Sequence, residues 1–216
     1  MPELKVCGVT DVAFACAAAQ RGVDYLGFIF AESSPRRVTP ARAREIRGAV
    51  ERSLAVGTAR PRFVGVFVEQ TAVGIAEIAR DIPLDVIQLH GDYGAYEVGE
   101  LKAAGYEIWR LHKSADDGGE DAVLLDGRRG TESRLADWSL VAELKRAGRR
   151  VVLAGGISAE NIAAAAATGA DIIDVNSALE TSPGVKSVEK LDALLRKLVL
   201  ATVTRPPGTG EAYQTP

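Results

Sequence analysis

Two side chains that can exchange protons come directly after apolar runs in the chain. Cys7 follows Val6, and Asp126 follows the run 122–125. A nearby cation or helix dipole would lower the pKa of the Cys7 thiol and make it a base, whereas a partly desolvated Asp126 carboxyl would have a raised pKa and could donate a proton. The ordinary alternatives are a small buried cysteine and an aspartate that binds turn amides. Together the two groups suit proton abstraction coupled to protonation of an oxygen.

Two further segments are rich in groups that bind phosphate. Gly155-Gly156 follows one apolar run, and Asn176-Ser177 follows the next. Backbone N–H groups without bulky side chains can approach a phosphate dianion closely, particularly where a short helix begins. A Gly-Gly pair alone is more often a tight turn, but the two segments together predict a phosphate site. Lys186, in the loop that leads to the last helix, is expected to be peripheral.

Cationic and imidazole side chains follow other apolar runs. Arg36 and Arg37 can hold an anionic group through a two-pronged hydrogen bond, with only one of them pointing inward; their alternative is a solvated turn. His90 can contact a ligand, although a histidine in such a place is often structural. Arg110 is expected to pair with an acidic neighbour. The spacing of His, Cys, Asp and Glu predicts no metal site, and no nucleotide-binding glycine motif is present, so no cofactor is predicted.

These residues need a scaffold that brings separate segments of the chain to one place. Short runs rich in Val, Ile and Leu, typical of strands buried on both faces, occupy residues 4–6, 25–30, 63–68, 86–89, 107–111, 122–125, 151–154 and 172–175. Four of them come shortly after a glycine that can end a helix in the left-handed conformation, namely Gly22, Gly105, Gly148 and Gly169. The pattern is that of parallel βα units.

Helical patterns fill most of the intervals between these runs. They cover residues 11–21, 40–53, 71–80, 93–104, 139–147, 159–168 and 188–200. Thr39 and Pro40 mark one helix start, because threonine caps a helix and proline is favoured in the first turn. Residues 113–121 are too few and too glycine-rich for a full helix, which predicts an abbreviated fifth crossover.

The alternation predicts a compact α/β fold, a single-domain (β/α)8 barrel of the TIM type. An open doubly wound sheet is the alternative, but an open sheet of this length usually has shorter edge strands and a different strand count. The barrel is expected to span residues 1–203, with 204–216 as a mobile tail. The carboxyl ends of barrel strands form the active face, so Cys7 and Asp126 are expected to face each other there.

Composition argues against several classes of protein. The chain has 216 residues, 47% of them apolar, which suffices for a large core. Its 26 Lys and Arg against 29 Asp and Glu give a net charge of −3, which argues against broad attraction to nucleic acid or an anionic membrane. The two cysteines cannot form a disulfide framework, and no secretory or membrane-spanning run is evident. We expect a cytoplasmic monomer or homodimer that acts on a small molecule.

The order of these motifs resembles that of the phosphoribosylanthranilate isomerase family of tryptophan biosynthesis. The segment 5–8, which contains Cys7, is similar to the family's first-strand motif. Segments similar to its other signatures follow in the same order, at residues 27–30, 34–36, 64–68, 88–91, 124–126, 153–156 and 174–177. The resemblance covers the chain to about residue 200.

The resemblance implies a cofactor-independent Amadori rearrangement of N-(5-phosphoribosyl)anthranilate to 1-(2-carboxyphenylamino)-1-deoxyribulose 5-phosphate. It implies that Asp126 is the general acid, which protonates the furanose ring oxygen, and that Cys7 is the general base, which removes the C2 proton. Arg36 would then hold the anthranilate carboxylate, and the loops at Gly155 and Ser177 would hold the phosphate. The imine itself serves as the electron sink.

Two other functions stay open at this point. Arg37, Arg128 and Arg129 add positive charge near the expected mouth, and Ala178 replaces a usual glycine of the family pattern. These departures, with a short and charged loop at 127–134, would fit the same rearrangement of another N-ribosyl phosphate in another pathway. The second alternative is a phosphosugar-binding barrel without activity, and the presence of both Cys7 and Asp126 argues against it.

Overall fold

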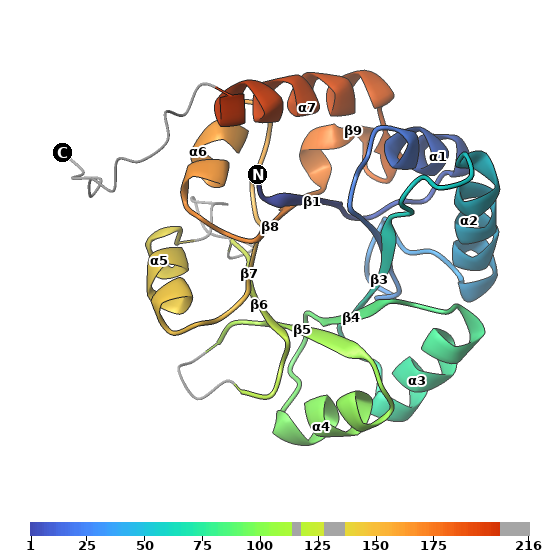
Figure 1. The fold of residues 1–216 in the computed structure, drawn as a ribbon. Coiled ribbons are helices and arrows are strands. Elements are labelled where there is room, and N and C mark those ends of the chain that lie inside the picture. The colour runs from blue at the N-terminus through green and yellow to red at the C-terminus, as the bar shows by residue number, and fades with distance from the viewer. Residues whose placement is uncertain (114–117, 128–136, 204–216) are drawn as a thin grey trace.

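Eight parallel strands close into a barrel in chain order, as a computed structural model of residues 1–113, 118–127 and 137–203 shows (Figure 1). The strands are β1 (Glu3–Val6), β2 (Tyr25–Ile29), β3 (Arg62–Phe67), β4 (Val86–Leu89), β5 (Glu107–Leu111), β6 (Ala122–Leu125), β7 (Val151–Leu153) and β8 (Ile172–Val175). Each pairs with the next, and β8 pairs with β1. The prediction of a (β/α)8 barrel rather than an open sheet is confirmed.

Helices form a ring outside the strands (Figure 1). They are α1 (Val12–Gln20), α2 (Pro40–Ser53), α3 (Ala72–Asp81), α4 (Ala95–Ala103), α5 (Ser139–Arg146), α6 (Ile162–Ala167) and α7 (Val188–Val203). In the described part of the connection from β5 to β6, residues 112–113 and 118–121, there is no helix, in agreement with an abbreviated fifth crossover. The expected tail, 204–216, and most of the expected charged loop, 127–134, lie outside the described residues.

The start of α2 shows how the sequence fixes a helix. The Thr39 side chain accepts a hydrogen bond from the Arg42 backbone N–H at 3.2 Å, and Pro40 begins the helix, as predicted. Its buried residues, Ala43, Ile46 and Val50, are three and four positions apart and therefore lie on one face. None of the described helices is both long and apolar enough to cross a membrane.

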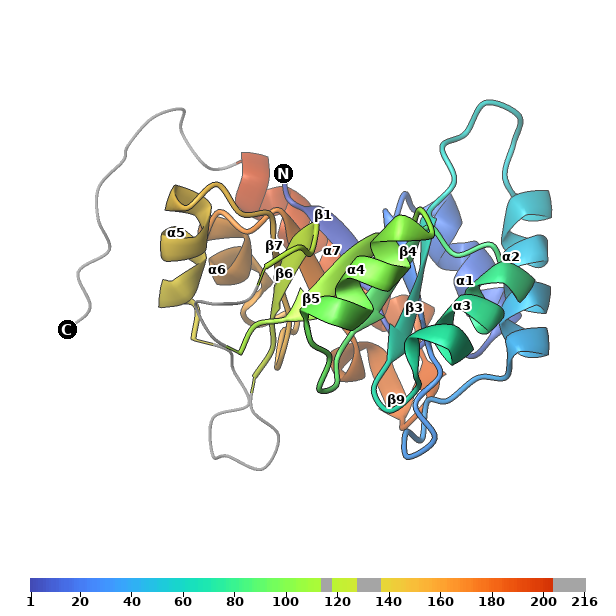
Figure 2. The same cartoon turned by 90° about the horizontal axis from the view of Figure 1, so that it is seen from below.

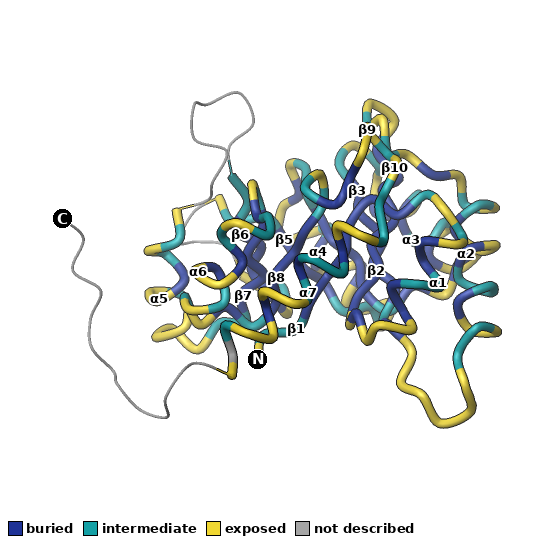
Figure 3. The backbone as a smooth tube through the Cα atoms, turned by 90° about the horizontal axis from the view of Figure 1, so that it is seen from above, coloured by how far each residue is buried: buried dark blue, intermediate teal, exposed yellow. Residues whose placement is uncertain are grey.

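The alternation of side chains along the strands places most of the buried apolar side chains in two cores. The outer core lies between the strands and the helices and contains, for example, Val6 and Ile46. The inner core fills the barrel lumen and consists of Tyr25, Val64, Val86, Trp109, Ala122, Leu124, Val152, Ala154 and Ile172. Figure 3 shows the strands as the buried centre of the molecule. Because side chains fill the lumen, a ligand must bind at one end of the barrel.

A charged network closes the amino end of the barrel. Arg150 contacts Glu3 at 2.6 Å, Glu107 at 3.1 Å and the Tyr25 hydroxyl at 2.9 Å. Arg62 donates a hydrogen bond to the other Glu107 oxygen at 2.6 Å. These side chains come from β1, β2, β3, β5 and the residue directly before β7, so the network links distant parts of the chain. The carboxyl end is left as the face for chemistry.

A short hairpin lies at that carboxyl end. After the 3-10 turn Ser177–Leu179, the strands β9 (Glu180–Ser182) and β10 (Val185–Lys186) pair in an antiparallel manner. Figure 2 shows β9 beside the barrel end, and Figure 3 shows β9 and β10 at the end opposite the amino terminus. The sequence predicted only a loop here, because strands of two and three residues around Pro183-Gly184 have no detectable period.

We expect Arg150→Met to lower the free energy of unfolding by about 1–2 kcal/mol, because two carboxylates lose hydrogen bonds from a charged donor. Equilibrium urea denaturation measures this loss. Lys102→Met is the matched control, since it breaks an exposed pair with Asp121 and should cost about 0.5 kcal/mol. Equal losses in the two variants would contradict a stabilising role for the network.

Candidate active site

Cys7 lies at the carboxyl end of β1 in an apolar enclosure. Its side chain is buried together with Ile29, Ala31 and Val66. Its backbone N–H donates to the Val175 carbonyl at 2.9 Å, which continues the pairing of β1 with β8. Burial raises the pKa of the Cys7 thiol, and nearby Lys5 only partly offsets this effect. The expectation of a lowered pKa is therefore wrong, because the loss of water outweighs the attraction of the cation.

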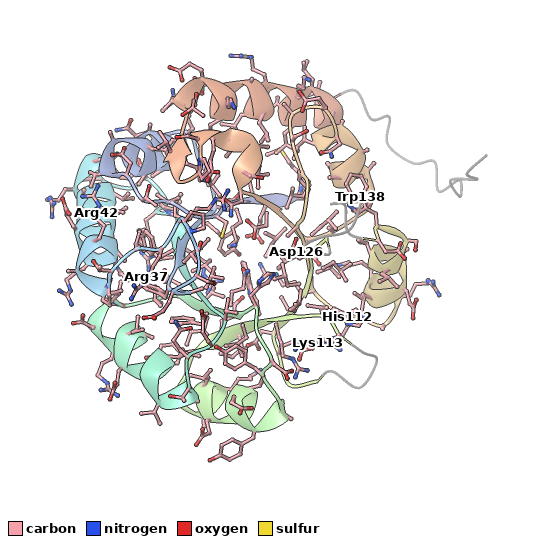
Figure 4. The ribbon with its side chains drawn as sticks, turned by 180° about the vertical axis from the view of Figure 1, so that it is seen from behind. Arg37, Arg42, His112, Lys113, Asp126 and Trp138 are labelled. Carbon is pink, nitrogen blue, oxygen red and sulfur yellow. The ribbon has the colours of Figure 1, made fainter. Side chains whose placement is uncertain are left out.

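Asp126 and His90 meet at the same end of the barrel. Asp126 directly follows β6 and His90 directly follows β4. Asp126 Oδ2 lies 2.8 Å from His90 Nε2, within hydrogen-bond distance. Figure 4 shows Asp126 near the middle of the barrel, whereas Arg42 lies on the surrounding helices. The structure thus joins two of the residues that the sequence singled out separately, and His90 orients the Asp126 carboxyl group.

A buried ion pair lies in the lumen beneath these groups. Lys5 Nζ is 2.5 Å from Asp174 Oδ2, and the side chains are 0% and 6% exposed. Burial raises the pKa of Asp174, Lys5 opposes this shift, and the charge of Asp126 adds to it. Because the charge of Lys5 acts on Cys7 and the charge of Asp126 acts on Asp174, the buried pair is electrostatically coupled to both Cys7 and Asp126.

Lys5 and Asp174 are not among the site residues predicted from the sequence. Lys5 and Asp174 are the charged members of the otherwise apolar runs 4–6 and 172–175, and each lies two positions before a residue that was identified, Cys7 or Asn176. Since side chains alternate between the faces of a strand, that spacing places Lys5 and Asp174 in the lumen. This two-residue spacing is visible in the sequence, but it points to the site only when the faces of the strands are assigned.

Arg36 is held by a carboxylate from the β9–β10 hairpin. Its Nε and Nη2 donate to the two Glu180 oxygens at 2.8 and 2.7 Å. Lys186 Nζ donates to Glu180 Oε1 at 2.9 Å and to Asn176 Oδ1 at 2.9 Å. Although burial opposes ionisation of Glu180, the hydrogen bonds from Arg36 and Lys186 lower its pKa to about 2. Glu180 is therefore a carboxylate that fixes two cations.

The expectation that Lys186 is peripheral is wrong. Its side chain is only 1% exposed, because the hairpin folds back over the barrel end and brings Lys186 against Asn176 and Glu180. Burial lowers the pKa of Lys186, and its bond with Glu180 opposes that shift. The unpredicted hairpin is the reason that the sequence could not place this residue.

The other arginines have separate partners. Arg37 pairs with Glu32 at 3.1 Å in an exposed position, so only Arg36 of the two turns toward the barrel, in line with the expectation. Arg110 is buried and lies 3.0 Å from a Glu120 oxygen, in agreement with the predicted pairing with an acid. Arg110 thus stabilises the connection between β5 and β6.

The two predicted phosphate loops flank these groups. Gly155 and Gly156 have φ angles of +83° and +67°, which only glycine adopts without strain. A Cβ atom on Gly155 would lie 2.2 Å from the Gly127 backbone N and 2.6 Å from Asp126 Oδ1, so this loop packs directly on the carboxyl group. Asn176 precedes the short 3-10 turn that begins at Ser177.

The loop after β1 packs against the loops after β2 and β8. A Cβ atom on Gly8 would lie 2.9 Å from both Asn176 Oδ1 and Arg36 Cδ. The loops after β1, β2 and β8 therefore meet at one point, beside the thiol of Cys7. In the described parts of the chain, no three His, Cys, Asp or Glu side chains are grouped as metal ligands.

Fold and site together define a (β/α)8-barrel protein with a buried thiol, a carboxyl group and fixed cations at the carboxyl ends of its strands. A family profile described as N-(5'phosphoribosyl)anthranilate (PRA) isomerase matches residues 4–197. The chain belongs to this family, because the match spans most of its length.

Individual relatives agree with this assignment. The N-(5'-phosphoribosyl)anthranilate isomerase of Rubrobacter xylanophilus is 38% identical over 215 residues, covering 93% of this chain and 98% of the relative. The crystal structure of the phosphoribosyl anthranilate isomerase from Thermus thermophilus superposes with a TM-score of 0.81 at 32% identity, covering 92% and 98% of the two chains. An isomerase solved in complex with reduced 1-(o-carboxyphenylamino)-1-deoxyribulose 5-phosphate gives 0.75 at 25% identity, covering 92% and 99%.

Gly155→Ala should destabilise the protein more than Gly169→Ala does. Both positions have a positive φ, +83° and +86°, so both variants carry a backbone strain of about 1–2 kcal/mol. Only the Gly155 variant also forces Asp126 and Gly127 apart, since nothing lies within 4 Å of the Cβ position of Gly169. This overlap should cost at least about 1 kcal/mol more. Chemical denaturation of the two variants gives the difference, and equal losses would refute the close packing of the loop on Asp126.

Proposed function

We propose that this chain is an N-(5'-phosphoribosyl)anthranilate isomerase that catalyses the Amadori rearrangement by general acid and base catalysis. The observation that carries the proposal is the placement of Cys7 and Asp126 at the carboxyl ends of β1 and β6, with the buried Lys5–Asp174 pair on β1 and β8. The family assignment and the named relatives support the same reaction.

The first step opens the sugar ring. Asp126 acts as the general acid and gives a proton to the furanose ring oxygen as the bond between that oxygen and C1 breaks. The electron pair of the anthranilate nitrogen forms the C1–N double bond, so the open sugar is a protonated imine. His90 keeps the Asp126 carboxyl group aimed at the ring oxygen through their 2.8 Å contact.

The second step moves a proton from carbon to sulfur. The Cys7 thiolate takes the C2 proton, the electron pair of the broken C2–H bond forms a C1–C2 double bond, and the pair of the C1–N double bond moves onto nitrogen to give a neutral enolamine. Loss of the proton from the C2 hydroxyl and addition of a proton to C1 then yield the ketose. The protonated imine accepts the electron pair, so the proposed reaction uses no cofactor.

Substrate binding is assigned to groups on either side of Cys7 and Asp126. Arg36 gives Nε and Nη2 hydrogen bonds to Glu180, which leaves its Nη1 group for the anthranilate carboxylate. The backbone N–H groups of Gly155, Gly156 and Ser177 are proposed to bind the phosphate, since these loops flank Asp126 and Asn176.

The alternative substrate, another N-ribosyl phosphate, loses part of its support. Arg37, one of the additional positive charges, is paired with Glu32 in an exposed position rather than turned toward the barrel end. Arg128 and Arg129 lie outside the described residues. Anthranilate, with a single carboxylate for Arg36, fits the described part of the site better.

Complementation of a tryptophan auxotroph that lacks this isomerase tests the proposal. The wild-type gene should restore growth without tryptophan, and genes for Cys7→Ala and Asp126→Asn should not. Failure of the wild-type protein to restore growth, although it accumulates in folded form, would refute the assigned substrate. A rearrangement of another N-ribosyl phosphate would give that outcome.

Purified Cys7→Ala should show a turnover at least about 100-fold lower, the usual effect of losing a positioned base. Cys16→Ala is the matched control with normal turnover, because Cys16 lies on α1 away from the barrel end. Steady-state kinetics measure both. Asp126→Asn should bind the reduced product analogue but show no turnover, whereas the wild-type protein should do both. A barrel that only binds phosphosugars would bind the analogue and show no turnover in either form. Normal turnover in Cys7→Ala would overturn the mechanism.

Arg36→Ala should raise KM by about tenfold or more while kcat changes little, because the bond to the carboxylate is present in both ground and transition states. Arg37→Ala, which removes an exposed arginine, should leave both constants near the wild-type values. A fall in kcat with unchanged KM would contradict this role of Arg36.

A further inference from the structure

The Lys5–Asp174 pair is an unusual occupant of a barrel lumen. Lys5 is fully buried, and apolar side chains such as Tyr25, Val64 and Ile172 fill the lumen around the pair. Two charges removed from water seldom stabilise a fold more than well-packed apolar residues of similar size would. The pair therefore calls for an explanation in terms of what it does to its neighbours.

The thiol of Cys7 is the neighbour that geometry identifies. Lys5 and Cys7 are two residues apart and project into the lumen from the same face of the chain. A Cβ atom on Gly27, in the adjacent strand β2, would lie 3.0 Å from Cys7 Sγ and 3.3 Å from Lys5 Cε. The sulfur and the end of the lysine side chain thus share the space that this glycine leaves open.

Charged groups surround the thiol from several elements. They are Lys5 on β1, Asp174 on β8, Lys186 on β10 and Arg36 in the loop after β2. Burial raises the pKa of Cys7; Lys5 and Lys186 act to lower it, and Asp174 acts to raise it. Of the two lysines, Lys5 has the larger effect.

Lys5 itself stays protonated. Burial acts to lower the pKa of Lys5, but the charges of Asp174 and Cys7 and their hydrogen bonds to Lys5 together outweigh burial and raise it. Of the two Asp174 oxygens, one accepts the bond from Lys5, and the other, also buried, has no hydrogen-bond partner among the residues that the structure describes. The carboxylate thus fixes the ammonium group, whose other N–H bonds are available to the sulfur.

We propose that Lys5 is a positioning residue of this site, whose ammonium group, anchored by Asp174, is the counter-charge of the Cys7 thiolate. An apolar enclosure makes a thiolate a stronger base but also hinders its formation. A fixed ammonium group beside the sulfur permits ionisation without admitting water. The proposal rests on the proposed function only in taking Cys7 as the base.

The test is a titration of the thiol without substrate, in a Cys16→Ala background so that Cys7 is the single cysteine. Thiolate absorbance and the rate of alkylation by iodoacetamide are followed against pH. Lys5→Met should move the midpoint upward by about 1 pH unit or more. The rising limb of kcat/KM against pH should move by the same amount.

Two further variants separate this role from a merely structural one. Lys5→Met leaves the Asp174 charge buried without a partner, so the double variant Lys5→Met, Asp174→Asn removes both charges and guards against misfolding. Its midpoint should still lie above that of the parent, because Lys5 affects the thiol more than Asp174 does. Arg150→Met, which weakens the network at the opposite end, should leave the midpoint unchanged.

An unchanged midpoint in either folded Lys5 variant would overturn the proposal. So would a shifted midpoint with an unshifted limb of kcat/KM, because Lys5 would then tune a thiol that does not limit catalysis. Failure of the proposed function is a separate result: a wild-type chain that does not rearrange the substrate would still show the midpoint shift.

Discussion

The burial of two opposite charges in an otherwise apolar lumen is the constraint on which the site depends. Lys5 and Asp174 are 2.5 Å apart and shielded from water, so neither can change its position or charge without a large electrostatic penalty to the other. β1 and β8, which carry them, are adjacent in the closed barrel. Closure of the barrel therefore brings the pair together, and the pair in turn fixes the field around Cys7.

A second set of charged side chains fixes the loops at the carboxyl end of the barrel. Glu180 holds Arg36 and Lys186, and Lys186 also binds Asn176, so the loop after β2, the end of β8 and the β9–β10 hairpin are joined by hydrogen bonds to charged groups. Such bonds are among the stronger ones in proteins. The cations are consequently in place before any anionic substrate arrives, which reduces the ordering that binding requires.

Much of the barrel could be predicted from the sequence, because apolar runs and helix-ending glycines repeat along the chain. Cys7, Asp126 and Arg36 could be singled out, since each follows a strand. The contacts among these residues could not be predicted from the sequence. To predict Lys5 and Asp174 as site residues, one must know which face of each strand points into the lumen. To predict Lys186, one must know the β9–β10 hairpin, which is too short to show a period. The raised pKa of Cys7 depends on burial, which only the packed structure reveals.

A crystal structure with the reduced product analogue bound would place Cys7 and Asp126 relative to the reacting atoms. Cys7 Sγ is expected within about 3.5 Å of the carbon derived from C2, on the same side of the sugar as Lys5. An Asp126 oxygen is expected within about 3.2 Å of the hydroxyl derived from the ring oxygen. An analogue bound with either side chain turned away from these atoms would rule out acid and base catalysis by this pair of residues.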